Sequence, residues 1–492
     1  MRTYRFSHLD DRRNARFCAT LLLAIVGSVG IATSASAQDD QRRFERQLRQ
    51  ADLAAYRLKP DTSLTLGERT QIDAGGYVAA TGVWLQDSDD NFRRLFQPEA
   101  SVYARGSLDG VHDFFIRARF AYRDYSSGDS FDGRGDSWNE PFVDRYWYDF
   151  NLKRYKAAYN NELIESNFSI RIGRQFIDWG ASLVLSDTLY AVRPVIEFNS
   201  AWRVELLAGI TPEHTTDFDS SRADYDDKTR RGFYGGRLVY STTEAAELYA
   251  YYLYSPDNYG GTVSRSPIVL TDVQFETNSH YAGLGTTGSI DPNWVYQAEI
   301  VGQFGTNMSD PLRGIQREDA LFAGAGRAQL TYVLRDPNQT RFQIEMLAGS
   351  GDGDRLAATT TVAGNQPGTQ DHSFQSLGFA NTGLAFGPSL ANLGSLRIGG
   401  NTHPFGNLGT TTELQIGVDA FVFNKIDSSA PIDEPTVSGS RFLGGEVDFY
   451  LNWRLTSDLS FNARYGVYFP GEAILGSKDT RYFVSAGLVL SF

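Results

Sequence analysis

The chain ends on a strictly alternating segment, in which every second residue is apolar or aromatic: Tyr482, Val484, Ala486, Leu488, Leu490 and Phe492. Alternation with a period of two indicates a β-strand whose two faces meet different surroundings. A strand of this kind that stops on a terminal Phe is typical of the closing strand of an outer-membrane β-barrel. A half-buried edge strand of a soluble protein has the same period, so the rest of the chain must decide between them.

Residues 1–37 are predicted to be a secretory signal peptide. Arginines precede an apolar run from Phe17 to Ala32, and Ala35-Ser36-Ala37 supplies a cleavage site of small residues. The only cysteine, Cys18, lies inside this segment. The mature chain from Gln38 is therefore expected to have no thiol, which excludes disulfides, thiolate catalysis and cysteine-ligated metals.

Charge and hydropathy narrow the class of protein further. The formal net charge of −13 gives no electrostatic footprint for nucleic acid. Beyond residue 37 no apolar stretch approaches the roughly 18–20 residues of a membrane helix. A barrel strand needs only about five lipid-facing apolar side chains, and 13% aromatic residues with 48 Gly suit aromatic girdles and turns.

We therefore predict an all-β fold, a transmembrane antiparallel β-barrel of about 18 strands over residues 70–492, preceded by a lead segment at 38–69 with no assigned role. The pattern predicts strands near residues 70–84, 97–108, 112–123, 142–152, 167–175, 188–196, 201–210, 233–241, 246–254, 276–286, 293–304, 322–334, 339–349, 394–402, 411–424, 442–455, 459–469 and 481–492. The alternation alone also fits a soluble β-sandwich with one solvated face.

The connections favour the barrel over the sandwich. Long connections are expected at one end, at 85–96, 124–141, 176–187, 211–232, 255–275, 305–321, 350–393, 425–441 and 470–480. Those at the other end are mostly short, such as 109–111, 335–338 and 456–458, with 153–166 as the exception. An even strand number with long and short connections in alternation is what an outer-membrane barrel requires, with both termini on the periplasmic side.

Strand parity predicts a set of arginines on the inward face as a substrate path: Arg105, Arg117, Arg119, Arg171, Arg203, Arg237, Arg327, Arg341, Arg397, Arg454 and Arg464. A guanidinium keeps its charge and binds carboxylates with a planar fork, so such a ladder would help a polyanion to pass. The alternative is a mixed network that fills the barrel, in which these arginines pair with inward acids such as Glu205, Glu299, Glu345, Glu413, Glu446 and Asp448.

Other chemistry has weaker support. Acidic outer loops, Asp352 and Asp354 among them, are a weak candidate for Ca²⁺, but no loop has the EF-hand spacing and solvated loops look the same. No His-Glu-x-x-His, Gly-x-Ser-x-Gly or phosphate-loop lysine is present, and adjacent residues such as His372 and Ser373 point to opposite faces of a strand. We expect neither enzyme activity nor a cofactor.

Several short segments, in order, resemble the alginate export family of outer-membrane barrels. They are Ile170-Arg171-Ile172-Gly173-Arg174-Gln175, Glu345 with Gly349-Ser350-Gly351-Asp352, Phe374 and Leu377, Asn392-Leu393 before Leu396-Arg397-Ile398-Gly399, Leu443-Gly444-Gly445-Glu446-Val447-Asp448, and the stretch ending Phe469-Pro470-Gly471. The loop after Gln175 and the N-terminal third depart from the family pattern, which leaves the substrate more open than the fold.

The resemblance implies an outer-membrane pore with a basic lumen that exports an anionic polysaccharide or a related anionic solute. A general or nutrient-specific uptake porin, and a surface structural or enzymatic barrel, remain alternatives. The expected partners are outer-membrane lipid and lipopolysaccharide, the anionic glycan or solute, and a periplasmic scaffold protein, but no nucleic acid.

The 350–393 connection is the longest and carries apolar side chains within a Gly, Asn, Ser and Thr background. Connections this long tend to be functional or disordered. We hypothesise that it folds over or into the pore mouth and gates it, and meets the lumen arginines through Asp352, Asp354 or Asp371. The alternative is a packed surface cap or an extra hairpin.

Overall fold

The computed structural model describes residues 69–492 except 89–90, 127–134, 220, 223–224, 226, 244–245, 259–263, 266–271 and 407–412. The signal peptide predicted at 1–37, and the lead segment at 38–69 apart from its last residue, lie outside the described residues. No helix within the described part of the chain is long and apolar enough to cross a bilayer.

Eighteen strands form one closed antiparallel barrel, as predicted. They are β1 (Gln71–Gln86), β2 (Phe92–Leu108), β3 (His112–Tyr125), β5 (Val143–Asn151), β6 (Asn167–Trp179), β7 (Leu185–Glu197), β8 (Trp202–Ile210), β9 (Gly232–Thr243), β10 (Ala246–Ser255), β13 (Thr277–Ser289), β14 (Trp294–Met308), β15 (Glu318–Val333), β16 (Arg341–Gly349), β17 (Leu393–Thr402), β18 (Glu413–Lys425), β19 (Phe442–Arg454), β20 (Leu459–Pro470) and β21 (Arg481–Ser491).

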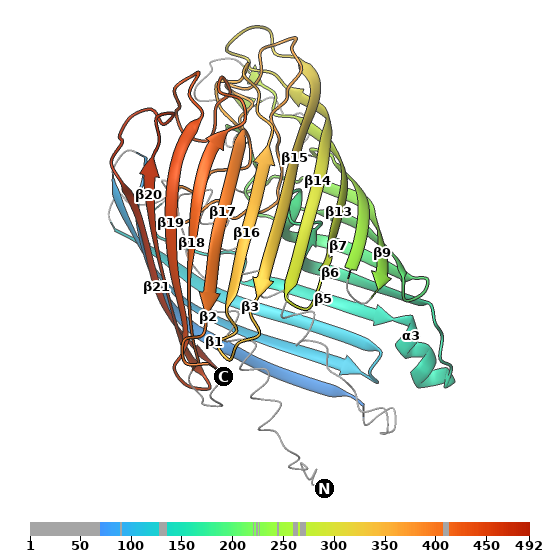
Figure 1. Ribbon diagram of the computed structural model, residues 1–492. Helices are drawn as coiled ribbons and strands as arrows, with labels where there is room; N and C mark the ends of the chain where they lie inside the picture. The colour runs from blue at the N-terminus through green and yellow to red at the C-terminus, as the bar shows by residue number, and fades with distance from the viewer. Residues whose placement is uncertain are drawn as a thin grey trace.

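The small elements lie in the connections. β4 (Ser137–Trp138) pairs with β3, and β11 (Ser264–Arg265) pairs with β12 (Asp272–Val273). The segment after β5 starts with a short helix, α3 (Leu152–Tyr155), followed by the π-helical turn η2 (Lys156–Asn160). In Figure 1, α3 projects sideways at the lower rim of the barrel.

The predicted closing strand closes the barrel. β21 pairs with β1 from Tyr77 opposite Ser491 to Leu85 opposite Phe483. Phe492 then exchanges two backbone hydrogen bonds with Gly76, each 2.9 Å long. The near end of the barrel, defined here as the end with Phe492 and the turns 109–111, 334–340 and 455–458, is the lower end in Figure 1; the far end carries most of the long connections.

The two faces of the wall differ in chemistry. The outward face is apolar: Leu284, Ile300 and Phe322, on three consecutive strands, are all exposed. Aromatic rings lie at two levels of this face, with Phe304 stacked on His280 at 5.3 Å towards the far end and Trp294 beside Tyr332 at 4.7 Å near the other end. An apolar band between two aromatic girdles is the outer surface of a membrane-spanning barrel.

Two of the connections predicted to be long are short, because the flanking strands run further than their alternation suggests. The connection predicted at 85–96 is only 87–91, where the Asp87 carboxylate accepts the Asn91 backbone N–H at 2.9 Å and binds Arg93 at 2.8 Å. The connection predicted at 176–187 is reduced to 180–184. Buried apolar residues there, such as Ile177 and Leu185, continue the strands inside the barrel.

Candidate channel interior

All of the predicted arginines lie on the inward face. On each strand the exposed apolar residues mark the outward face, and the arginine has the opposite parity. These arginines are Arg105, Arg117, Arg119, Arg171, Arg203, Arg237, Arg327, Arg341, Arg397, Arg454 and Arg464. They occur at several depths: Arg105 and Arg203 lie near one rim, whereas Arg327 and Arg397 lie further along their strands.

On the side of the barrel formed by β1 to β5, each of these arginines has its own carboxylate. Arg105 binds Asp73 at 2.8 Å. Arg119 binds Glu99 at 2.7 Å, and Glu99 also accepts the hydroxyl hydrogen of Tyr77. Arg117 binds Asp144, with 2.9 Å between Nε and Oδ1.

Elsewhere in the wall, on β8 and on β16, a carboxylate is shared between two arginines. Glu205 binds Arg203 at 3.0 Å and Arg237 at 2.8 Å. Glu345 likewise binds two guanidinium groups, those of Arg327 and Arg397. These contacts match the mixed-network interpretation for Glu205 and Glu345.

The other predicted arginines have different surroundings. Arg171 binds Asp149 at 3.0 Å and lies 4.0 Å from the centre of the Trp147 ring, a cation–π geometry. Arg464 lies 5.9 Å from the centre of the Tyr450 ring, and Arg454 stands opposite Glu413 in the register. Arg341 is exposed at the start of β16.

Parity reasoning missed further inward arginines, Arg145, Arg193 and Arg481 among them. Arg145 alternates with Trp147 on β5, and Arg193 stands opposite Arg171. Arg481, at the start of β21, binds Glu434 from the 426–441 connection, with one contact of 3.0 Å. The alternation around Arg145 was enough to predict that it points inward. The partner of Arg481 lies in a distant connection, so no local sequence pattern indicates that contact.

Two inward acids, Glu446 and Glu299, accept hydrogen bonds from backbone N–H groups and do not pair with an arginine. The mixed-network interpretation is therefore wrong for these two residues. The Glu446 carboxylate accepts the backbone N–H groups of Leu384, Ala385 and Phe386, the last two at 2.7 and 2.9 Å. Glu299 accepts the backbone N–H of Ala181 and the hydroxyl hydrogens of two tyrosines on β10. For Glu413 the partner is His403, at 3.5 Å.

Each of these two contacts relies on a glycine with a left-handed backbone. Gly180 has φ +64° and Gly383 has φ +94°. A Cβ on Gly180 would lie 2.2 Å from a Glu299 oxygen, and one on Gly383 would lie 2.6 Å from the Glu446 carboxyl carbon. Only glycine combines this conformation with so close an approach.

Residues 374–391, named here the strap, extend from one side of the wall to the other inside the far half of the barrel. Phe374, Leu377 and Leu390 pack in a buried cluster with side chains of β6 to β16. Leu384 packs in a second cluster with β1, β2, β3 and β21. Phe386 packs against a third cluster, which includes Phe423 and Tyr468, so the strap contacts the wall on every side.

The inward turn at 180–184 meets the strap in the middle of the lumen. Ser186 donates its backbone N–H to the Leu377 carbonyl at 2.9 Å, and Phe379 donates to the Ser182 carbonyl at 2.7 Å. From the opposite wall, Arg327 donates to the Ala181 carbonyl at 2.8 Å. The strap and this turn are therefore joined to each other and to β15 across the interior of the barrel.

The contacts expected for Asp371 and Asp352 are wrong, because neither carboxylate binds one of the predicted lumen arginines. Asp371 binds Arg355 of the same connection and accepts from Asn307 at 2.8 Å. Asp352 accepts the backbone N–H groups of Asp354 and His372, at 2.7 and 2.9 Å, and so closes a local turn. Among the described residues, no three His, Cys, Asp or Glu side chains gather as they would around a metal ion.

A cavity of about 470 Å³ lies beside the strap and is lined by Phe379, Asp433 and Arg481 among others. Burial raises the pKa of Asp433, whose carboxylate accepts the Ser389 backbone N–H at 2.6 Å. Burial also raises the pKa of Asp219, which binds the Thr361 hydroxyl and so links the 211–231 connection to the 350–392 connection. Contacts of this kind hold the far-end connections and the strap in place against one another.

Replacing Glu446 by Gln should loosen the strap. The carboxylate accepts three backbone N–H groups, and Gln has a single neutral acceptor oxygen, so docking should weaken by about 1–3 kcal/mol. In planar bilayers we expect more frequent open events than in the parent protein. Glu413→Gln, which alters the pair between the exposed Glu413 and the half-buried His403, is the matched control and should leave gating unchanged.

A closed barrel with an apolar girdled exterior and a charged interior is a membrane-spanning channel of the outer-membrane class. The family described as alginate export matches residues 99–483. The chain belongs to the alginate export family. Family and fold fit an outer-membrane channel for export of an anionic polysaccharide, and the family is one of export channels, which are not enzymes.

Solved structures similar to this one include three proteins of Pseudomonas aeruginosa. OccK11 (OpdR) is 12% identical, with 88% of this chain and 99% of that chain covered and a TM-score of 0.47. OccK5 (OpdH) is 12% identical, covering 87% and 99%, with a TM-score of 0.48. OccK2 (OpdF), solved in complex with glucuronate, is 12% identical, covering 86% and 97%, with a TM-score of 0.48. None of the curated proteins compared matches the chain.

Proposed function

We propose that the protein releases an anionic polysaccharide across the outer membrane along its inward arginines, with both termini in the periplasm. The family match over residues 99–483 carries the substrate class. The shared carboxylates support the path: Glu345 already bridges Arg327 and Arg397, so a carboxylate of the polymer can take the place of Glu345 on either guanidinium. The polymer would then move by exchange between neighbouring arginines.

The orientation rests on the position of the short turns. Outer-membrane barrels have short periplasmic turns and longer outer loops, and the near end carries the short turns together with Phe492. The strap then lies towards the cell surface. A scaffold partner would meet the near rim, and no catalytic role is proposed for the barrel.

The ionic selectivity of the open channel tests the arginine path. We expect reversal potentials in a KCl gradient to show preference for anions, and addition of a uronic-acid polymer on the near side to reduce the current. Weak selectivity or preference for cations, with no effect of the polymer, would favour the uptake porin. Almost no conductance even after removal of the strap would favour a structural barrel.

A matched pair of variants isolates the shared cluster. Arg327→Gln, Glu345→Gln, Arg397→Gln and Asp419→Asn together replace two positive and two negative charges of one buried cluster, so that no member keeps its charge without its partner. Anion preference should fall clearly in this variant, because the two arginines proposed to hand the polymer along are gone. Arg105→Gln with Asp73→Asn removes one charge of each sign and should leave the preference close to that of the parent protein.

A further inference from the structure

A row of aromatic rings leaves the outward face of the wall and continues into the helical segment at the near rim. Phe114 of β3 lies 5.1 Å from Tyr148 of β5, centre to centre. One step along the same face of β5, Phe150 lies 6.0 Å from Tyr155 of α3, and Tyr155 lies 5.0 Å from Tyr159 of η2. The rim segment therefore extends the membrane-facing surface beyond the end of β5.

Polar contacts on its other side hold the segment in this position. The Asn151 side chain caps α3 by accepting the Arg154 backbone N–H at 3.0 Å. The Arg154 guanidinium binds Asp113 at 2.7 Å, and the Tyr159 hydroxyl donates to Asp109 at 2.5 Å. These contacts fasten the segment to β3 and to the turn that precedes it.

We propose that residues 152–163 lie in the phospholipid headgroup layer at the near rim and anchor the barrel there. Tyr155 and Tyr159 are 37% and 42% exposed, and rings with a polar hydroxyl favour the boundary between hydrocarbon and water. Leu163 is 89% exposed, which suits contact with the acyl boundary. The Lys153 ammonium, exposed and with no acidic partner among the described residues, is placed to bind lipid phosphate.

Under the orientation proposed above, this rim faces the inner leaflet, where the occupant is a glycerophospholipid. The competing occupant is a periplasmic protein that would dock on the same tyrosines in water. Continuity with the lipid-facing girdle favours the lipid, because Phe114 and Tyr148 already belong to that girdle. The location does not depend on which solute passes through the barrel.

Site-directed spin labelling separates the two occupants. The only cysteine of the chain is Cys18, inside the predicted signal peptide, so a single introduced cysteine can be labelled and the parent protein reports any background. Labels are placed at Tyr159→Cys and Ala157→Cys in the full barrel, reconstituted in phosphatidylethanolamine–phosphatidylglycerol nanodiscs. Ile300→Cys is the reference inside the bilayer, and Ser457→Cys, in a near-end turn, is the reference in water.

The readout is the ratio of collision rates with oxygen and with a water-soluble nickel chelate. At Tyr159→Cys or Ala157→Cys we expect a ratio above that of Ser457→Cys and below that of Ile300→Cys. Ratios at both sites equal to that of Ser457→Cys would overturn the proposal and leave the aqueous docking surface. Heat-modifiable migration of every variant confirms that the barrel is folded.

A second measurement tests the contribution of the rings. Tyr155→Ala with Tyr159→Ala, read through the label at Ala157→Cys, should shift the ratio towards the aqueous reference. Lys153→Glu should lower the retention of anionic over zwitterionic phospholipid in native mass spectra. No change in either experiment would show that the segment does not bind the headgroup layer.

Discussion

Deletion of residues 356–388 should increase the single-channel conductance severalfold in planar bilayers. The deletion removes most of the strap, whose Phe374, Leu384 and Phe386 reach three separate clusters on the wall. It also removes the donors that bind Glu446, so nothing would bridge the lumen from that side. The measurement is the step size of single insertions in salt solution.

Two controls keep this result interpretable. The variant must show the heat-modifiable migration of a folded barrel, since the strap also contributes buried apolar surface to the wall. Replacement of residues 476–479, mostly exposed residues of the far-end connection 471–480, by a Gly-Ser linker of the same length should have a much smaller effect. An unchanged conductance in a correctly inserted deletion variant would show that the strap does not close the channel.

Ile300→Arg should impair membrane insertion by about 2–4 kcal/mol, the cost of a lipid-facing arginine near the middle of a bilayer. Ile300 is 67% exposed on the outward face of β14. It lies between Trp294 at one end of the strand and Phe304 towards the other, which are the two aromatic levels of that strand. Folding into vesicles under urea titration, followed by heat-modifiable migration, gives the free energy.

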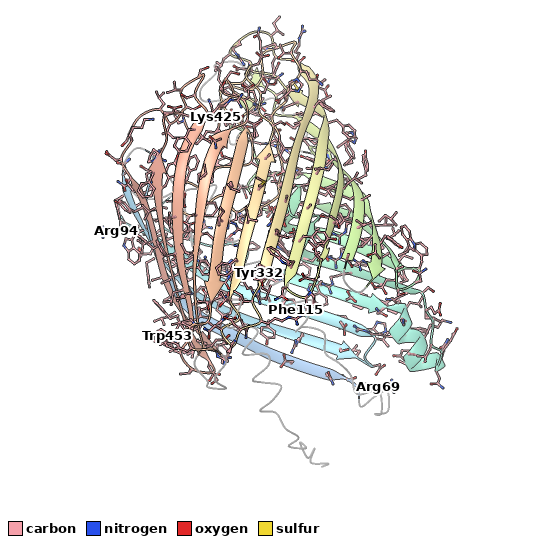
Figure 2. The ribbon with its side chains drawn as sticks, in the orientation of Figure 1. Arg69, Arg94, Phe115, Tyr332, Lys425 and Trp453 are labelled. Atoms are coloured by element: carbon pink, nitrogen blue, oxygen red, sulfur yellow. The ribbon has the colours of Figure 1, made fainter. Side chains whose placement is uncertain are left out.

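Two control substitutions differ from Ile300→Arg in their depth in the bilayer or in the face of the wall that carries the charge. Trp453→Arg also places a cation on the outward face, but Trp453 is next to the last residue of β19 and lies at the lower rim in Figure 2, where the cost falls to about 0–1 kcal/mol. Asn452→Arg puts the charge on the inward face of the same strand and should insert normally. Equal losses for all three variants would contradict the assigned faces.

The strands and their two faces could be predicted from the amino-acid pattern alone. Every predicted strand has a counterpart, and residues such as Phe449 and Leu488 lie on the exposed face that their alternation indicates. The reason is local: a period of two fixes which side chains share a face, whatever the neighbouring strand is. The same reasoning assigned the inward parity of Arg117 and Arg397.

The binding partners of those inward side chains could not be predicted, because they depend on how the strands and connections pack in three dimensions. Whether Glu345 meets Arg397 depends on the register between two strands separated by the longest connection of the chain. The partners of Glu446 and Glu299 are backbone N–H groups, which every residue carries, so no residue type marks them in advance. The path of the strap across the lumen also depends on closure of the barrel, because only the closed barrel places β6, β19 and β21 around the same interior.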